Sequence, residues 1–231
     1  MEAKVSNTKY LLPLKEAFEK NENPENAIRM KAYMKGKFEY FGIKAPERKE
    51  IVKEFLKTYG LPETDKINNI VKESWNFPQR EFQYFAMSLS EKYIKKSKTE
   101  IINLFEFMIA NKQWWDTVDY IAANLVGKLF LKFPEMIIPY TSKWMDSGDI
   151  WFKRTAILFQ LKYKENTDLD LLFNYISQLY GSKEFFINKA IGWILREYSK
   201  TDAEAVKLFV ANNSGSLANL SKREALKRIK L

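Results

Sequence analysis

Apolar residues recur at spacings of three and four along almost the whole of this 231-residue chain. That spacing places them on one face of a helix, and no segment of useful length alternates apolar and polar residues as a half-buried strand does. Gly and Pro interrupt the pattern, and the connections are short. The expected helices cover residues 8–20, 24–37, 46–59, 63–74, 79–95, 98–111, 115–131, 134–146, 150–164, 168–180, 183–199, 202–212 and 220–230. The chain is therefore predicted to be all-α.

A helical unit repeats along the chain. Equivalent places are occupied by Arg80, Asp119, Arg154, Lys189 and Arg223, at intervals of 39, 35, 35 and 34 residues. This period is typical of stacked helix pairs. We expect a right-handed α-α superhelix (solenoid) of about six HEAT-like helix pairs, with one helix of each pair lining a concave basic groove. No stretch has the composition of a flexible linker, so residues 1–231 are predicted to form a single domain.

The charge of the chain and the residue types that it lacks limit the classes of function that it can have. The chain has 38 Lys and Arg against 29 Asp and Glu, a net charge of +9, which favours an anionic partner and above all nucleic acid. Charge alone leaves open a basic protein without such a partner. Because Cys and His are absent, thiolate metal sites, cysteine nucleophiles and imidazole bases are excluded. We expect no metal, no cofactor and no membrane segment, in a cytoplasmic protein that is nucleoid-associated in a prokaryotic cell.

Among the five residues at equivalent places in the repeat, which we call the column, Asp119 is the acid and the other four are basic. Trp115 precedes it by four residues and therefore shares its helix face. An unpaired carboxylate would repel phosphate, so its presence suggests that it meets a positive group. Two candidates are a cationic nucleobase and the oxocarbenium that develops at C1′ when a glycosidic bond breaks. Trp114 and Trp115 point about 100° apart, which leaves a simple packing role open for one of them.

Two further helix faces carry the same mixture of basic and aromatic residues. Lys189, Trp193 and Arg196 stand at i, i+4 and i+7, and Arg154 begins another stripe that continues to Lys162. Each stripe alone could be a solvated face, or a core Trp with basic neighbours. Stripes in register favour a groove in which cations contact phosphates and aromatic rings cover a sugar or a base.

Several segments together resemble one known family. They are Ala32-Tyr33-Met34-Lys35, GIKAPER at 42–48, REFQ at 80–83, WWDTVD at 114–119, WFKRTAILFQLKYK at 151–164, SKEFFINKAIGWILREY at 182–198 and LSKREALKRI at 220–229. In this order they resemble the AlkD family of DNA alkylation repair enzymes, which are HEAT-like repeat glycosylases. The resemblance extends over about residues 10–230.

The resemblance implies a set of site residues. Asp119 would be the catalytic carboxylate, with Trp115 and Trp193 on either side of the deoxyribose of the lesion. Tyr33 would complete the aromatic cleft, while Arg154 and Arg196 hold the flanking backbone. The residues expected to bind DNA are Tyr33, Arg48, Arg80, Arg154, Lys162, Lys189, Arg196 and Arg223.

The function implied is that of a monofunctional DNA glycosylase. It would hydrolyse the N-glycosidic bond of positively charged alkylpurines, of the 3-methyladenine and 7-methylguanine type, in duplex DNA, without drawing the base into a pocket. We expect a monomer. Two alternatives stay open from the residues: a non-catalytic HEAT-repeat protein that binds bent or branched DNA, and a protein–protein scaffold. Release of a base from alkylated DNA would distinguish the glycosylase from both alternatives.

Overall fold

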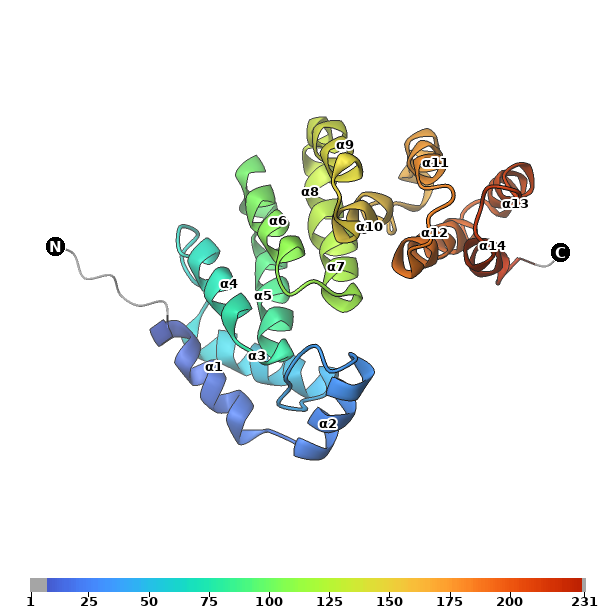
Figure 1. Ribbon diagram of the computed structural model, residues 1–231. Helices are drawn as coiled ribbons and strands as arrows, with labels where there is room; N and C mark the ends of the chain where they lie inside the picture. The colour runs from blue at the N-terminus through green and yellow to red at the C-terminus, as the bar shows by residue number, and fades with distance from the viewer. Residues whose placement is uncertain (1–7, 230–231) are drawn as a thin grey trace. The chain divides into compact units, whose positions relative to one another are not determined.

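The computed structural model describes residues 8–229, and its elements are helices joined by short connections (Figure 1). Over that range no strand is present, and a single isolated β-bridge joins Glu39 to Gln79. The all-α prediction is therefore confirmed. The chain divides into two compact units after Lys96. The single domain, the superhelix and the concave groove stay predictions.

The first unit is built around aromatic residues contributed by two helices and by the segment between α2 and α3. Phe82 contacts Phe18 and Phe41, with ring centroids 5.3 and 6.1 Å away, and all three side chains are buried. The elements of this unit are α1 (Thr8–Lys20), α2 (Pro24–Tyr33), α3 (Ala45–Tyr59), α4 (Ile67–Asn76), α5 (Arg80–Tyr93) and η1 (Ile94–Lys96).

Helix α2 ends four residues earlier than predicted. Lys35 and Gly36 follow it with φ values of 58° and 73°, in the left-handed region that terminates a right-handed helix. Helix α4 is also displaced, since it begins at Ile67 rather than at residue 63. It ends at Asn76, where Phe77 is extended before Pro78, as steric contact with a proline ring requires.

A buried carboxylate fixes the segment that leads into α3. Glu81 accepts hydrogen bonds from the backbone N–H groups of Phe41, Gly42 and Ile43, at 3.2, 3.0 and 3.3 Å. Burial raises the pKa of Glu81, and these backbone donors oppose the rise. Gly42 has a φ of 86°, and a Cβ there would lie 2.1 Å from the carbonyl oxygen of Asn23. The segment therefore has little freedom to move.

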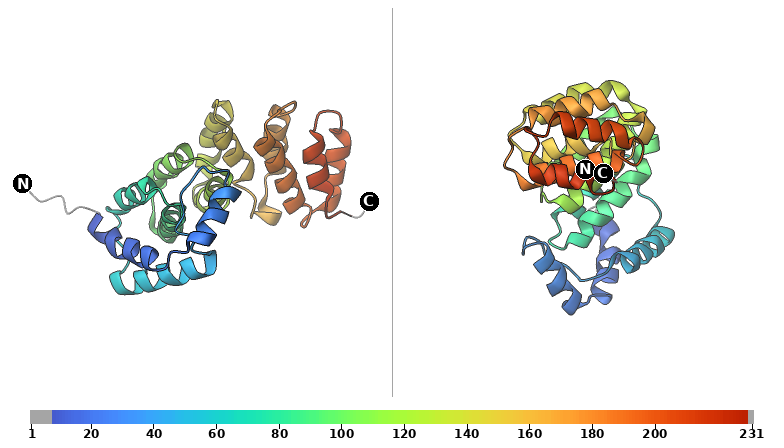
Figure 2. Two further views of the ribbon diagram at one scale, coloured as in Figure 1. Left: turned by 60° about the horizontal axis from the view of Figure 1, so that its bottom comes forward. Right: turned by 90° about the vertical axis from the view of Figure 1, so that its right-hand side faces the viewer.

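The second unit contains a row of helices packed in succession: α7 against α10, α10 against α12, and α12 against α14 (Figure 2). Its elements are η2 (Thr99–Ile101), α6 (Ile102–Ala110), α7 (Trp115–Tyr120), η3 (Ile121–Val126), α8 (Gly127–Lys132), η4 (Pro134–Met136), α9 (Ile137–Asp146), α10 (Ile150–Leu158), η5 (Lys164–Asn166), α11 (Leu169–Gln178), α12 (Phe185–Tyr198), α13 (Ala203–Asn212) and α14 (Asn219–Leu226). Residue 230, the predicted end of the last helix, lies outside the described residues.

Hydrogen bonds within the second unit join residues about one sequence period apart. The hydroxyl groups of Thr141 and Tyr175, 34 residues apart, lie 2.7 Å from each other. The hydroxyl of Tyr163 donates to the carbonyl oxygen of Gly127, 36 residues away, at 2.7 Å. The interval found in the sequence is thus also the interval between hydrogen-bonding partners in the second unit.

The helix predicted over residues 115–131 changes type along its length. Residues Ile121–Val126 form a π-helix, and the N–H of Gly127 donates to the carbonyl oxygen of Ala122, five residues back. Gly127 also lies against α10, because a Cβ there would be 2.4 Å from the carbonyl oxygen of Phe159. π-Turns are uncommon and occur frequently at functional sites. This one begins two residues after Asp119.

Candidate active site

Asp119 lies on α7 and forms a two-pronged ion pair with Arg154 of α10. The Arg154 Nε donates to Oδ1 at 2.6 Å, and Nη2 donates to Oδ2 at 2.8 Å. The two side chains are 12% and 3% exposed. The interpretation of Asp119 as an unpaired acid is therefore wrong. Its partner stands one period away in the same column, so the carboxylate is held in a fixed orientation.

Two opposing effects act on the Asp119 carboxyl group. Burial raises its pKa above the ordinary value, while the hydrogen bonds and positive charge of Arg154 lower it. The nearby charge of Asp116 adds to the rise. Arg154 thus favours the ionised form of an acid that burial would otherwise protonate.

Arg154 also connects α10 to α12. Its Nη1 donates a hydrogen bond to the carbonyl oxygen of Phe186, in the first turn of α12. With a side chain only 3% exposed and donors directed at Asp119 and Phe186, Arg154 is placed to position the acid. The direct contact with the DNA backbone expected for Arg154 stays a prediction.

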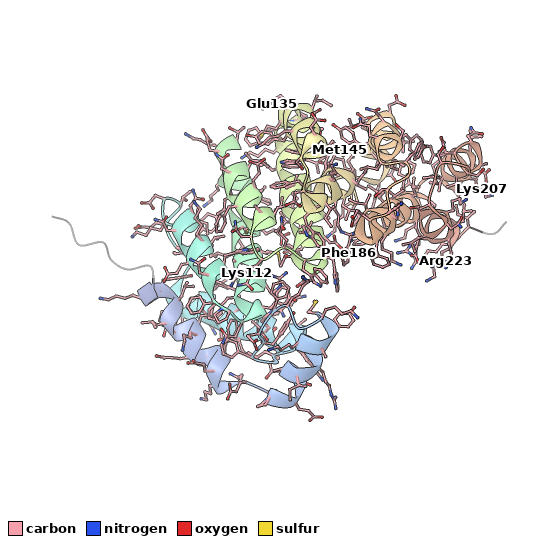
Figure 3. The ribbon with its side chains drawn as sticks, in the orientation of Figure 1. Lys112, Glu135, Met145, Phe186, Lys207 and Arg223 are labelled. Carbon is pink, nitrogen blue, oxygen red and sulfur yellow. The ribbon has the colours of Figure 1, made fainter. Side chains whose placement is uncertain are left out.

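The two adjacent tryptophans have different surroundings. Trp114 contacts Trp151 and Phe186, with ring centroids 5.7 and 5.0 Å away. Trp115 is half-buried and begins α7, one turn before Asp119. Figure 3 labels Phe186 at the beginning of α12. Trp114 therefore belongs to an aromatic packing cluster, and Trp115 is the tryptophan that shares a helix face with the acid.

A second acid, not identified from the sequence, secures the approach to α7. Asp149 caps α10 by accepting from the N–H of Trp151 at 2.7 Å, and it also accepts from the side-chain amide of Gln113. Gln113 and Asp149 are 36 residues apart. Their separation by one period was the only sequence signal that could have paired them. The pair ties the segment before α7 to the first turn of α10.

The basic face of α12 is joined to α14 by another missed acid. Glu224 is 9% exposed and receives Lys189 Nζ at 2.8 Å and Arg196 Nη1. The hydrogen bond from Lys189 lowers the pKa of Glu224; burial opposes this, and the charge of Lys189 together with the hydrogen bond and charge of Arg196 adds to the lowering. Trp193, half-buried, lies between the two cations in the α12 sequence. Glu224 follows Lys189 by 35 residues, the separation that also relates Asp119 to Arg154.

The remaining cations of the second unit are more accessible. Lys162 is exposed, and its Nζ donates to Asn124 Oδ1 at 2.6 Å. Arg223 is exposed on α14, and in the view of Figure 3 it lies with Phe186 on the side of this unit away from Glu135. Both cations can reach an anionic ligand from the surface.

In the first unit, Tyr33 and Arg48 border one surface cavity. Tyr33 is 69% exposed at the end of α2, and the Arg48 guanidinium lies 4.3 Å from the ring centroid of Tyr84. The cavity has a volume of about 470 Å³, and Arg29 and Lys44 contribute to its wall. Its combination of tyrosines and cations suits an aromatic or anionic ligand.

The surroundings of Arg80 do not support the DNA contact expected from the sequence. Arg80 is 0% exposed, and its guanidinium lies 3.7 Å from the centroid of the Phe38 ring. Its backbone N–H donates to the carbonyl oxygen of Glu39 at 2.8 Å. The residue that begins α5 therefore has a structural role, although it occupies the same place in the repeat as Asp119.

Comparison with known proteins identifies the family. Residues 14–229 match the family model of the DNA alkylation repair enzyme. The chain belongs to the DNA alkylation repair enzyme family. A solved structure of this description, the predicted DNA alkylation repair enzyme from Enterococcus faecalis, is 33% identical and superposes with a TM-score of 0.83, over 90% of this chain and 96% of that one.

Other structures share the fold of this DNA alkylation repair family member. AlkD2 from Streptococcus mutans is 18% identical, with a TM-score of 0.66 over 98% of this chain and 100% of its own. The protein smu.31 from Streptococcus mutans UA159 is also 18% identical, with a TM-score of 0.60 over 79% and 92%. At this identity the likeness concerns the fold alone. No curated protein matches the sequence.

No helix within residues 8–229 combines the length and the apolar character needed to cross a membrane. Among the same residues, no three acidic side chains gather in a way that could hold a metal ion.

Proposed function

We propose that this member of the DNA alkylation repair enzyme family is a DNA glycosylase. It hydrolyses the N-glycosidic bond of positively charged alkylpurines in duplex DNA and does not draw the base into a pocket. The observation that carries the proposal is the Asp119–Arg154 pair, a nearly buried carboxylate that is oriented by a guanidinium and stands one turn after Trp115.

The chemistry needs little beyond this pair. An alkylated purine leaves as a neutral base, so a general acid to protonate the leaving group is unnecessary. The bond to be broken leaves a sugar with oxocarbenium character at C1′. A fixed carboxylate stabilises that charge and can hold the attacking water, and the face of Trp115 adds cation–π attraction. Each carboxylate oxygen of Asp119 has two lone pairs, and Arg154 occupies one on each, so acceptor capacity is left for these tasks.

The decisive experiment is release of 7-methylguanine from alkylated duplex DNA. Asp119→Asn keeps the shape of the side chain and removes its charge, so we expect the rate to fall by about 10² or more, the scale of losing one electrostatic stabiliser. Asp170→Asn, at an exposed acid on α11, is the matched control and should release base at the wild-type rate. Full activity in Asp119→Asn would show that Asp119 is not the catalytic group.

Trp193 separates catalysis from binding. If its ring covers the sugar in the transition state, Trp193→Ala lowers the rate of base release more than it lowers the affinity for DNA. Single-turnover rates and equilibrium affinities measured on the same duplex give the two losses. Equal losses would make Trp193 a binding surface only. If the wild-type protein binds duplex DNA but releases no base, the chain is a non-catalytic DNA-binding protein.

A further inference from the structure

One carboxylate joins the two cations on the basic face of α12. Lys189 and Arg196 are seven residues apart, which on a helix is a rise of about 10 Å. Both side chains nevertheless converge on Glu224, with Lys189 at Oε1 and Arg196 at Oε2. Glu224 is 9% exposed, whereas the two cations are 38% and 21% exposed. The acid thus lies beneath two cations that solvent can reach.

The packing of α14 on α12 fixes the position of this acid. A Cβ at Gly192 would lie 2.5 Å from the Cβ of Glu224 and 2.9 Å from the carbonyl oxygen of Ser221, so only glycine permits this approach. The buried hydroxyl of Ser221 donates to the carbonyl oxygen of Asn188 at 2.8 Å. Glu224 is consequently held against α12 by backbone packing as well as by its ion pairs.

We propose that Glu224 is a positioning residue that holds Lys189 and Arg196 together as one binding site for a DNA phosphodiester group beside Trp193. The trio has a net charge of +1, and each cation has more N–H donors than the one that Glu224 accepts. Two cations fixed in advance lose less conformational entropy when they bind a phosphate. The inference rests on the proposed function, because it requires DNA on this face.

Charge and geometry make opposite predictions about Glu224. If the acid merely neutralises the cations, its removal strengthens binding to a polyanion. If it positions them, its removal weakens binding although the protein becomes more positive. The number of cations that contact phosphate is read separately, from the slope of log affinity against log salt concentration.

The experiment measures binding of the full chain to an undamaged duplex over a range of salt concentrations. For Glu224→Gln we expect affinity to fall about three- to tenfold, and the magnitude of the slope to fall by about 0.9, the loss of one phosphate contact. The control is Glu197→Gln, which makes the same charge change on α12 at an acid bonded to Lys200 at 2.6 Å. It should leave the slope unchanged and the affinity equal or slightly higher.

A variant that lacks both cations tests whether Glu224→Gln acts only by disturbing the structure. In a protein that already carries Lys189→Met and Arg196→Met, adding Glu224→Gln should not change the slope further. Tighter binding by Glu224→Gln, or an unchanged slope with a lowered melting temperature, would overturn the proposal. Wild-type protein that fails to bind duplex DNA would refute the proposed function and this inference together. Normal binding without base release would refute the proposed glycosylase alone.

Discussion

At the scale of single residues, the role of a charged side chain is decided by what it contacts. Asp119 and Arg154 were both candidates from the sequence, one for chemistry and one for DNA. In the structure the two side chains form an ion pair. Because Arg154 has almost no exposed surface, its guanidinium contacts the acid and not solvent. In the proposed reaction, Arg154 therefore acts through the charge state and orientation of Asp119.

This arrangement predicts the pH dependence of an Arg154 variant. In the proposed reaction the carboxylate is the active form of Asp119, so we expect the rate to fall as pH falls through its pKa, which burial has raised. Arg154→Met removes the hydrogen bonds and the charge that oppose this rise, so the acid limb should move to higher pH and the maximal rate should fall. Single-turnover release of 7-methylguanine from about pH 5 to 8 measures the limb. Lys153→Met, at the preceding position on α10, is the control.

If the acid limb of the Arg154→Met pH–rate profile stays at the same pH or moves to lower pH, Asp119 does not limit the reaction at low pH.

The sequence could place Asp119, Trp115 and Trp193 on helices because amphipathic spacing determines which residues share a face. It could not show that Arg80 is buried or that Glu224 lies beneath Lys189. Those features depend on which helices pack together and how closely, and no local pattern encodes that distance.

At the scale of helices, most predicted spans agree with the structure to within a few residues, as the apolar period dictates. The exceptions have local causes, such as the left-handed residues Lys35 and Gly36 after α2. The π-helix over residues Ile121–Val126 could not be predicted, because its apolar residues also fit an α-helix. Gly127, which follows it, lies against the carbonyl oxygen of Phe159 at the end of α10.

This close approach predicts the effect of a single methyl group. Gly127→Ala would place a Cβ 2.4 Å from the Phe159 carbonyl oxygen. Overpacking of this kind costs about 1–3 kcal/mol, so we expect a melting temperature lower by about 2–12 °C, despite the better helix propensity of alanine. Gly148→Ala is the control, since a Cβ at Gly148 meets no atom within 4 Å. Equal melting temperatures for the two variants would contradict the packing argument.

At the scale of the whole molecule, a net charge of +9 overstates the number of cations that can contact DNA. Arg80 and Arg154, two of the basic residues first expected to bind it, are 0% and 3% exposed. The predicted DNA contacts that keep accessible surface are Arg48, Lys162, Lys189, Arg196 and Arg223. Their number, and not the net charge, should set the salt dependence of binding.

The salt dependence of duplex binding tests this count. Each phosphate contact contributes a slope of about −0.9 to log affinity against log salt concentration. Lys189 and Arg196 share one phosphate in the proposed site, so the accessible cations make four contacts and together predict a slope of about −3.6. Arg223→Gln should reduce its magnitude by about 0.9, because Arg223 is exposed on α14. Lys207→Gln on α13, where the lysine pairs with Glu204 at 2.8 Å, should leave the slope unchanged. Equal effects of the two substitutions would mean that DNA responds to the overall charge of the protein and not to the column of basic residues on its successive helices.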